Sequence, residues 1–532
     1  MPSPLCADCG HSATFNTKFP TSPAPKLLGS NQVAPTTLAP TIRRTVANTQ
    51  RDISRLDLEI YRLHDMAHEL RQKRDALQTF NTMHMALISP VHHMPPEILS
   101  EIFIRCQGTP SFHPTDRDGG VCLDTVPFLL GKICSRWRYV SLSTPKLWAS
   151  IQLSVGFHNA ESLAMMAKTW LARSGTCPLS IALNIRRGYA EFSSELLMQV
   201  LLRHSDRWRS IYLCMPLSDI KCFSPAKNWI PQLQRLLANV TDFIDAPPPR
   251  WKEMIDIFEC APQLHSFNLA PDSPTSLLKV PYHQLKHLDL QGRSATETLN
   301  ILGLTLNLET CVVSPTMQES QHPPVLLRNL RYIHISIWVN LGNFFDRLSL
   351  PMLRELSIDL QDDDPWMGIP ELICLISRGS LETFLFHCRP NLSHRYLQHS
   401  DMIKVLLAAP SLVELDLSGG GPEFMTKSFL AQFTCHRKLE QMNVPQLLPR
   451  LRTIKVDYTP SFFDILAFAD AVQSRMMVNS TGGASQEIVS TACIRRVQIR
   501  WFPVTEPLDS IVLSRWQQLQ DLGLDLSIIP RR

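Results

Sequence analysis

The sequence predicts a chain of the α+β to α/β class, in which an N-terminal helix and a small helical unit precede an irregular solenoid of short parallel strands and helices. Three observations predict this class. A heptad pattern of apolar residues fills the segment before residue 90, two apolar helix patterns follow a pair of prolines near residue 95, and a short apolar unit recurs from about residue 206 to the C-terminus.

Length and composition are those of a folded protein with several units. The chain has 532 residues, more than one core usually organises, and 44% of them are hydrophobic against 19% charged. The net charge of +4 is too small over this length to indicate a nucleic-acid-binding face. No secretory signal follows Met1, and no run approaches the roughly 18 apolar residues of a membrane helix. We therefore expect neither nucleic acid nor membrane as a partner, and an intracellular location that is cytoplasmic, nuclear or both.

Residues 1–41 are rich in Pro, Ser, Thr and Asn and carry few charges. Such a segment buries too little apolar surface to offset its chain entropy, so it is predicted to be a disordered tail. Within it, Cys6 and Cys9 have the spacing of half a zinc knuckle, but no second pair follows nearby, and no metal site or cofactor is predicted. Without a secretory signal, the fourteen scattered cysteines indicate reduced thiols.

Residues 42–88 predict one long amphipathic helix with coiled-coil character. Within residues 46–77, apolar residues recur at steps of three, four or seven, with charged residues between them. Arg74 and Asn81 occupy positions of the same stripe and weaken it. Two alternatives therefore stay open: the helix packs on the next unit of its own chain, or residues 46–77 pair with a second copy in a homodimer.

Residues 89–151 predict a small helical unit. Pro95 and Pro96 suit the first turn of a helix, where a missing N–H group has no partner to lose. The apolar residues after them share one face of that helix: Ile98, Leu99, Ile102 and Phe103. The later segment "ICSRWRYVSLSTPKLWASI" repeats the helical spacing through Trp137 and ends on the bulky pair Leu147 and Trp148. So small a unit cannot hide this many large apolar residues, which indicates a partner surface.

The order of these residues resembles an F-box. That family's pattern is a Leu-Pro-x-Glu-Ile-Leu helix start, a Val-Cys-x-x-Trp-Arg helix and a Pro-x-Leu-Trp close, to which "MPPEILSEIF" and "ICSRWRYVSLSTPKLW" correspond. The heptad helix upstream and "WLARSGTCPLSIAL" downstream resemble the large F-box families of mushroom-forming fungi. The chain departs from the pattern at Met94, where Leu is usual but Met conserves volume, and in its longer linker from Gln107 to Thr125.

An apolar-x-x-apolar-x-apolar unit repeats behind this motif. Its clearest copies begin at Leu264, Leu285, Leu308, Leu330 and Leu353, and successive starts differ by 21, 23, 22 and 23 residues. These intervals lie within the ~20–29 residue period of leucine-rich repeats. Weaker copies begin at Trp208, Leu233, Leu381, Leu412, Leu451, Ile494 and Leu519. The chain thus resembles an irregular leucine-rich-repeat solenoid over residues 206–532, with residues 152–205 as a connecting helical or strand segment.

A stack of such repeats forms an extended strand surface, because one repeat cannot cover its own apolar face and must pack on its neighbours. The leucines and isoleucines of the unit are then core residues. Binding would fall to the residues between them, for which the sequence offers Arg331, His334, Asp359 and Asp416 without ranking them.

The sequence carries no catalytic motif with its structural context, so no enzyme is predicted and no catalytic residue is assigned. The Gly419–Gly421 run lacks the Lys-Ser/Thr of a phosphate-binding loop, and Asp362–Asp364 is explained as a solvated turn.

The F-box resemblance implies a substrate-recognition subunit of a Skp-cullin-F-box ubiquitin ligase, acting in ubiquitin-dependent protein degradation. It implies docking on a Skp-family adaptor, and through it on a cullin, while the repeats bind an unknown client protein. The residues expected to bind the adaptor are Pro95, Ile98, Leu99, Ile102, Phe103, Trp137, Leu147 and Trp148, some of which must instead belong to the F-box core. The alternative is a non-catalytic, self-associating scaffold that recruits no ligase.

Overall fold

A computed structural model of the chain describes residues 19–29, 32–107, 126–155, 160–185, 194–240, 255–271, 278–316, 322–338, 342–361, 368–388, 399–417, 425, 427–435, 447–458, 464–476, 493–501 and 510–530. Cys6, Cys9, Asp362–Asp364 and Gly419–Gly421 lie outside these ranges, as does most of the linker between the two F-box-like segments. By its internal contacts the chain forms two units, residues 1–99 and residues 100–532.

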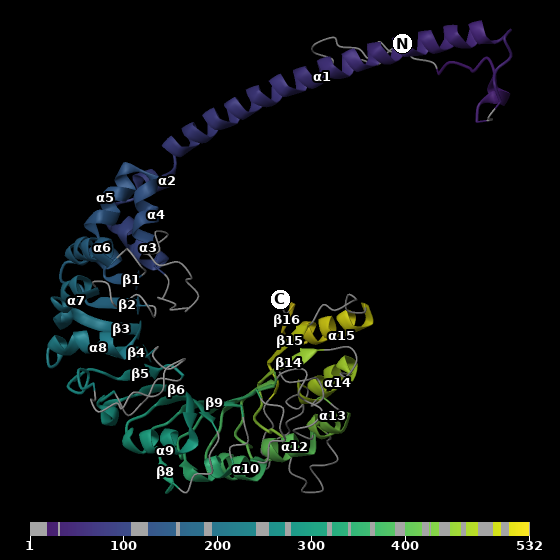
Figure 1. The fold of residues 1–532 in the computed structure, drawn as a ribbon. Helices are drawn as coiled ribbons and strands as arrows, with labels where there is room; N and C mark the ends of the chain where they lie inside the picture. The colour runs from purple at the N-terminus through teal and green to yellow at the C-terminus, as the bar shows by residue number, and fades with distance from the viewer. Residues whose placement is uncertain are drawn as a thin grey trace. The chain divides into compact units, whose positions relative to one another are not determined.

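The first unit is dominated by one long helix. After the short 3-10 helix η1 (Pro25–Leu27), α1 runs from Ala39 to Leu87 and is followed by α2 (Pro90–His93). The long helix predicted for residues 42–88 is thereby confirmed (Figure 1). No side chain described for α1 is buried. Its stability therefore rests on intrahelical hydrogen bonds and on weak, exposed ion pairs such as Arg62 with Glu59 at 3.8 Å.

The helical segments of the F-box-like region begin and end close to where the prolines predict. Helix α3 (Pro96–Cys106) starts at the second proline of the pair, and the N–H of Leu99 donates to the carbonyl of Pro95 at 3.0 Å. In the second unit follow α4 (Val126–Ile133), α5 (Ser135–Ser143) and the 3-10 helix η2 (Pro145–Trp148). The Cys134 thiol caps α5 by accepting from the N–H of Trp137 at 3.4 Å.

Fourteen of the described strands form a single parallel sheet, and they follow one another in sequence order (Figure 1). The strands are β1 (Ser150–Val155), β2 (Leu179–Ile185), β3 (Trp208–Met215), β4 (Arg235–Val240), β5 (Ser266–Leu269), β6 (His287–Ser294), β7 (Thr310–Thr316), β9 (Tyr332–Ile337), β11 (Glu355–Leu360), β12 (Thr383–Cys388), β13 (Glu414–Leu417), β14 (Thr453–Tyr458), β15 (Arg496–Trp501) and β16 (Asp525–Pro530). The two-residue strands β8 (Val325–Leu326) and β10 (Leu348–Ser349) pair separately.

Helices connect the strands and lie along one face of the sheet (Figure 1). They are α6 (Ala160–Arg173), α7 (Ser194–Leu202), η3 (Ser205–Arg207), α8 (Leu217–Ile220), η4 (Lys221–Ala226), η6 (Tyr282–Gln284), α9 (Ala295–Leu304), η7 (Gly342–Arg347), α10 (Ile369–Ser377), α12 (His399–Leu407), α13 (Lys427–Phe433), α14 (Ile465–Met476) and α15 (Ser510–Asp521). We call the opposite face of the sheet, which no described helix of the second unit covers, the open face.

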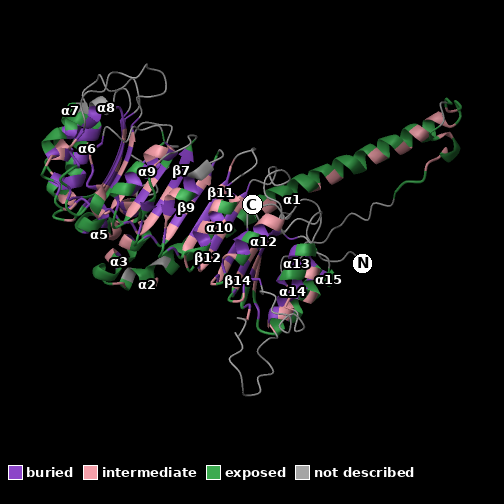
Figure 2. Ribbon diagram, turned by 90° about the horizontal axis from the view of Figure 1, so that it is seen from below, coloured by how far each residue is buried: buried purple, intermediate pink, exposed green. Residues whose placement is uncertain are grey.

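The repeat prediction is confirmed in register as well as in spacing. Leu288 of β6 lies between Phe267 of β5 and Cys311 of β7, and all three are buried. Alternation along the strands gives the two faces, so in β9 Ile333 and Ile335 face the core while His334 lies on the open face. Figure 2 shows the same alternation of buried and intermediate residues along the sheet. The fold is a leucine-rich-repeat-like array of the predicted α+β to α/β class.

The sheet differs from the prediction at its two ends. It begins before residue 206: β1 starts at Ser150, at the end of the segment 89–151, and β2 lies within residues 152–205, predicted as a connecting helical or strand segment. Trp148, Ile151 and Leu153 already have the apolar spacing of the repeat. At the other end Leu519 lies within α15 and the last strand begins at Asp525. The apolar unit starting at Leu519 therefore spans the end of a helix and the turn before the strand.

One buried cation secures the chain near the C-terminal repeats. Arg475 of α14 is fully buried, and its guanidinium donates to the carbonyls of Phe433 at 2.6 Å, Leu448 at 2.9 Å and Leu447. Burial lowers its pKa to about 10. Leu447 and Leu448 lie in a turn in which Leu448 has a positive φ of 51°, and Phe433 is the last residue of α13. The guanidinium therefore satisfies carbonyl groups that regular secondary structure leaves unpaired.

The described cysteines are all free thiols. Among the described helices, none is long and apolar enough to cross a membrane.

Candidate interaction surfaces

The eight residues expected to bind an adaptor fall into two groups by burial. Pro95, Ile98 and Ile102 are exposed, and Trp137 is half-buried. The other four are almost completely buried: Leu99, Phe103, Leu147 and Trp148. Because a buried side chain reaches a partner only if the fold opens, the structure assigns these four to the core and leaves the exposed residues as contact candidates.

Trp148 is the centre of an aromatic cluster that joins the helices to the first repeat. Its ring centroid lies 4.8 Å from that of Trp170 on α6 and 5.9 Å from that of Phe128 on α4. The guanidinium of Arg173 stacks over the same ring at 4.5 Å, and the indole N–H donates to the carbonyl of Ser141 at 2.8 Å. The Leu-Trp pair of the F-box-like segment thus holds the helical segments to β1 and α6.

A second contact orders the N-terminal side of the same unit. The rings of Phe103 on α3 and Trp137 on α5 lie 4.8 Å apart between centroids. The side-chain amide of Gln107, just after α3, donates to the carbonyl of Leu147 at 2.7 Å. Together these contacts fix α3 against α5 and η2.

Around this core, α3, α4 and α5 keep large apolar side chains in solvent. Within the second unit these are Ile102, Leu129, Ile133, Tyr139 and Leu142. Only Ile102 was among the predicted contacts; Leu129, Ile133, Tyr139 and Leu142 were not. For Leu129 and Ile133 the signal in the sequence is that "VPFLLGKI" is apolar around most of a short helix, and such a helix packs only one face against its neighbours. We call these five residues the exposed apolar set.

The open face of the sheet is the second candidate surface, and its polar side chains pair across neighbouring strands. His287 Nδ1 lies 2.7 Å from Thr310 Oγ1, and His334 Nδ1 lies 2.8 Å from Ser357 Oγ. Burial lowers the pKa of His334, while Asp359 acts in the opposite direction. A neutral His334 at pH 7 therefore serves as a hydrogen-bonding group rather than as a charge.

Acidic residues gather on the open face between β11 and β14. Glu355 and Glu414 lie on either side of Thr383 in one row, and Asp416 pairs in register with Lys455. The ammonium group of Lys455 lies 2.5 Å from a Glu414 oxygen and 3.8 Å from an Asp416 oxygen. Burial raises the pKa of Glu355, and the charge of Glu414 adds to that effect.

The four residues that the sequence offered on the repeats do not form one site. His334 and Asp359 lie half-buried on neighbouring strands, and Asp416 is buried beside Lys455. Arg331 is exposed and lies directly before the N-terminal end of β9. Within the described residues, no group of three or more His, Cys, Asp or Glu side chains could hold a metal ion.

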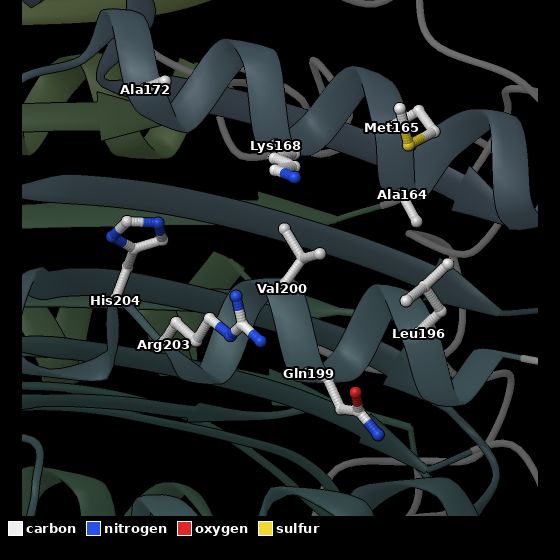
Figure 3. Close-up of a pocket in the computed structure, with 9 residues that line it drawn as sticks. All are labelled: Ala164, Met165, Lys168, Ala172, Leu196, Gln199, Val200, Arg203 and His204. Carbon is white, nitrogen blue, oxygen red and sulfur yellow. The ribbon is translucent and has the colours of Figure 1, made fainter.

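A pocket with a volume of about 430 Å³ lies between α6 and α7 on the helical side (Figure 3). Its lining combines small and apolar residues with three basic ones: Ala164, Met165, Lys168, Ala172, Leu196, Gln199, Val200, Arg203 and His204. Burial, and secondarily the charge of Arg207, lowers the pKa of His204. The cations that line the pocket are therefore Lys168 and Arg203, and both side chains lie on the surfaces of helices. We assign the pocket no ligand.

Comparison with known proteins adds little to this description. No protein-family model and no curated protein matches the chain. Among solved structures, one entitled "Crystal structure of TLR13-ssRNA13 complex" is similar at 12% sequence identity with a TM-score of 0.29. That similarity covers 73% of this chain, and the chain spans 62% of the length of the chain it matches.

Proposed function

We propose that this chain is a substrate-recognition subunit of a Skp-cullin-F-box type ubiquitin ligase. Its F-box-like segments would dock on a Skp-family adaptor and thereby on a cullin, while the repeats bind a client protein. Other subunits would form the bond to ubiquitin. This chain would contribute proximity, which is worth roughly several kcal/mol when it orients a substrate.

The observation that carries this proposal is the exposed apolar set on α3, α4 and α5. A small helical unit that already has a well-packed core around Trp148 does not need five further large apolar side chains in water. Apolar side chains of this kind, together with a polar rim, are typical of protein–protein interfaces. The order of the F-box-like residues in the sequence also supports a protein–protein interface here, and the resemblance to an F-box implies that the partner is a Skp-family adaptor.

The open face supports the second half of the proposal. Most of its side chains are polar or charged, with apolar ones such as Leu237, Val312 and Leu385 among them. Its strands are held in register by the core behind them, so it offers an extended, preformed surface. No described helix of the second unit covers it. We propose that the client binds there.

Ile133→Asp in the full chain tests the adaptor contact, with Ile102→Asp as a second variant. Ile133 is 59% exposed at the last position of α4, and Leu304 is 57% exposed at the last position of α9, which makes Leu304→Asp a matched control. We expect either test variant to weaken binding of a purified Skp-family adaptor about tenfold or more, since a charge would be buried against an apolar partner. Leu304→Asp should bind as the unaltered chain does.

Circular dichroism would establish that all variants keep their fold. If the unaltered chain did not bind the adaptor, or if all three variants bound equally well, the ligase proposal would be wrong. The second candidate function is then a self-associating scaffold, which the exposed apolar stripe of α1 favours independently.

A further inference from the structure

Helix α1 carries an unpartnered apolar stripe. The exposed fractions of its large members Val46, Ile53, Ile60, Leu63, Leu70 and Leu77 lie between 43% and 69%, and Leu56 and Ala67 complete the row. A helix of 49 residues with such a stripe gains most of its stability when the stripe is buried. We call these eight residues the seam.

The heptad positions of the seam indicate a two-stranded partner. Val46, Ile53, Ile60 and Ala67 fall at a, followed by Arg74 and Asn81, while Leu56, Leu63, Leu70 and Leu77 fall at d. In parallel coiled coils, β-branched residues at a with leucine at d favour two helices over three or four, so a pair of helices is considered in both orientations. An exposed seam on a helix that every copy of the chain carries fits a second copy of itself.

A parallel pair is opposed by its charges. Residues at a would face their own counterparts, so Arg74 would meet Arg74 of the second copy inside the seam. Flanking positions g and e of successive heptads would also meet, which sets Asp52 beside Asp57 of the second copy. Arg74 forms an ion pair with Asp75 of its own helix at 2.6 Å, which offsets only part of the first repulsion because that pair is exposed.

An antiparallel pair resolves both conflicts. When Val46 faces Leu77 of the second copy, every member of the seam faces another member: Ile53 faces Leu70, Ile60 faces Leu63, and Leu56 faces Ala67. Arg74 then faces the hydroxyl-bearing Thr49. At the flanking positions Asp52 lies beside Lys73 of the second copy, and symmetry gives each contact twice.

The neighbouring antiparallel register is less consistent. A shift of one heptad would set Val46 against His84 and Leu56 against Arg74, which leaves three apolar pairs in each half of the seam instead of four. That register gains the flanking pair Glu59 with Lys73, but an exposed ion pair is worth less than about 1 kcal/mol, whereas a buried leucine is worth about 1.5–3 kcal/mol. Apolar matching therefore decides the register.

We propose that α1 pairs with α1 of a second copy as an antiparallel coiled coil in which Val46 lies opposite Leu77. This inference does not depend on adaptor binding. With a rise of 1.5 Å per residue, the two Leu87 residues would lie about 75 Å apart along the axis, whereas a parallel pair would bring them together. The dimer would thus present its two following units at opposite ends of the coiled coil.

Cysteine cross-linking of the full chain tests orientation and register together. Ile53→Cys and Leu70→Cys lie opposite each other only in the proposed register, and α1 itself contains no cysteine. The two variants would be mixed under reducing conditions, oxidised, digested and mapped by mass spectrometry, with the unsubstituted chain as background. We expect a disulfide between positions 53 and 70 in the mixture and none within α1 for either variant alone. Links from 53 to 53 or from 70 to 70 would overturn the proposal.

Charge substitutions give a second readout that no cysteine affects. Asp52→Lys should weaken the dimer about tenfold in sedimentation, since two ion pairs become two repulsions, and Lys73→Asp should do the same. The double variant should return to within about threefold. Positions 52 and 73 lie about 31 Å apart on one helix, so this rescue requires two copies. In a parallel pair, Asp52→Lys would instead strengthen association, because it removes the repulsion from Asp57.

Glu69→Lys makes the same charge change at position c, away from the seam, and should leave the dimer unchanged. A monomeric unaltered chain, or a dimer that ignores both single substitutions and forms no link between positions 53 and 70, would also overturn the proposal.

Discussion

Asp289 on the open face is a carboxyl group that the fold only partly satisfies. The Asn268 amide donates to its Oδ2 atom at 2.7 Å, while its Oδ1 atom is buried without a hydrogen-bond partner. Burial raises the pKa of Asp289 from 3.8 to about 6. The folded chain therefore binds this proton more tightly than the unfolded chain does.

Asp289→Asn should make the protein more stable at neutral pH but not in acid. Since the folded pKa is raised, the stability contributed by the bound proton is complete below pH ~4 and is lost as the pH rises through about 6. Above that range we expect the variant to be more stable by about 2 kcal/mol, a value discounted for partial exposure. Unfolding measured at about pH 4.5 and pH 7.5 checks this; equal stabilities at the higher pH would contradict it.

At the residue scale, the sequence predicts helix α3 correctly but does not show which of its apolar residues are buried and which are exposed. Ile98, Leu99, Ile102 and Phe103 form two adjacent rows about 100° apart, and only the row of Leu99 and Phe103 is buried. Part of the reason is Trp137, whose ring meets that of Phe103 from a helix more than thirty residues later. The sequence shows both rows, and only the fold shows where the second helix lies.

At the scale of elements, η2 joins the helical segments to the sheet. Trp148 closes the F-box-like segment and also starts the first apolar unit of the sheet, and its ring packs between Phe128 and Trp170. A substitution at Trp148 therefore changes folding before it changes any partner contact. An adaptor-binding assay on such a variant would report on stability.

Trp148→Ala should destabilise the protein by about 3–5 kcal/mol, the cost of emptying a buried aromatic site, and should loosen α4, α5 and β1 first. Trp229→Ala is the control, because Trp229 is largely exposed and its loss should change stability by less than about 0.5 kcal/mol. Thermal unfolding of both full-length variants provides the comparison. Similar unfolding temperatures would show that Trp148 does not hold this junction.

Most repeat elements could be predicted because their spacing reflects a local physical need. Each strand must place two apolar side chains beneath its helix, which fixes units such as Leu330, Ile333 and Ile335. The first two strands were not assigned to the repeats because Trp148 had already been assigned to the helical motif. The Asp289 carboxyl group, with one oxygen hydrogen-bonded and one not, and the pocket between α6 and α7 both depend on residues distant in the sequence. No residue spacing predicts them.

At the scale of the whole molecule, the second unit separates two kinds of surface. Its apolar side chains in solvent include the exposed apolar set on the three helices before β1, whereas the open face of the fourteen strands carries mostly polar and charged groups. Repeats contact their neighbours in sequence, so the sheet can vary along its length without loss of register. Such a division suits a protein that holds one partner by its first helices and another by its strands.

The measurement that tests this division most directly is hydrogen–deuterium exchange of the full chain with and without a purified Skp-family adaptor. Our account predicts that the adaptor slows exchange in residues 96–106 and 126–143 and leaves strands β5 to β15 unchanged. Slower exchange in those strands, or no change in the three helices at saturating adaptor, would contradict it.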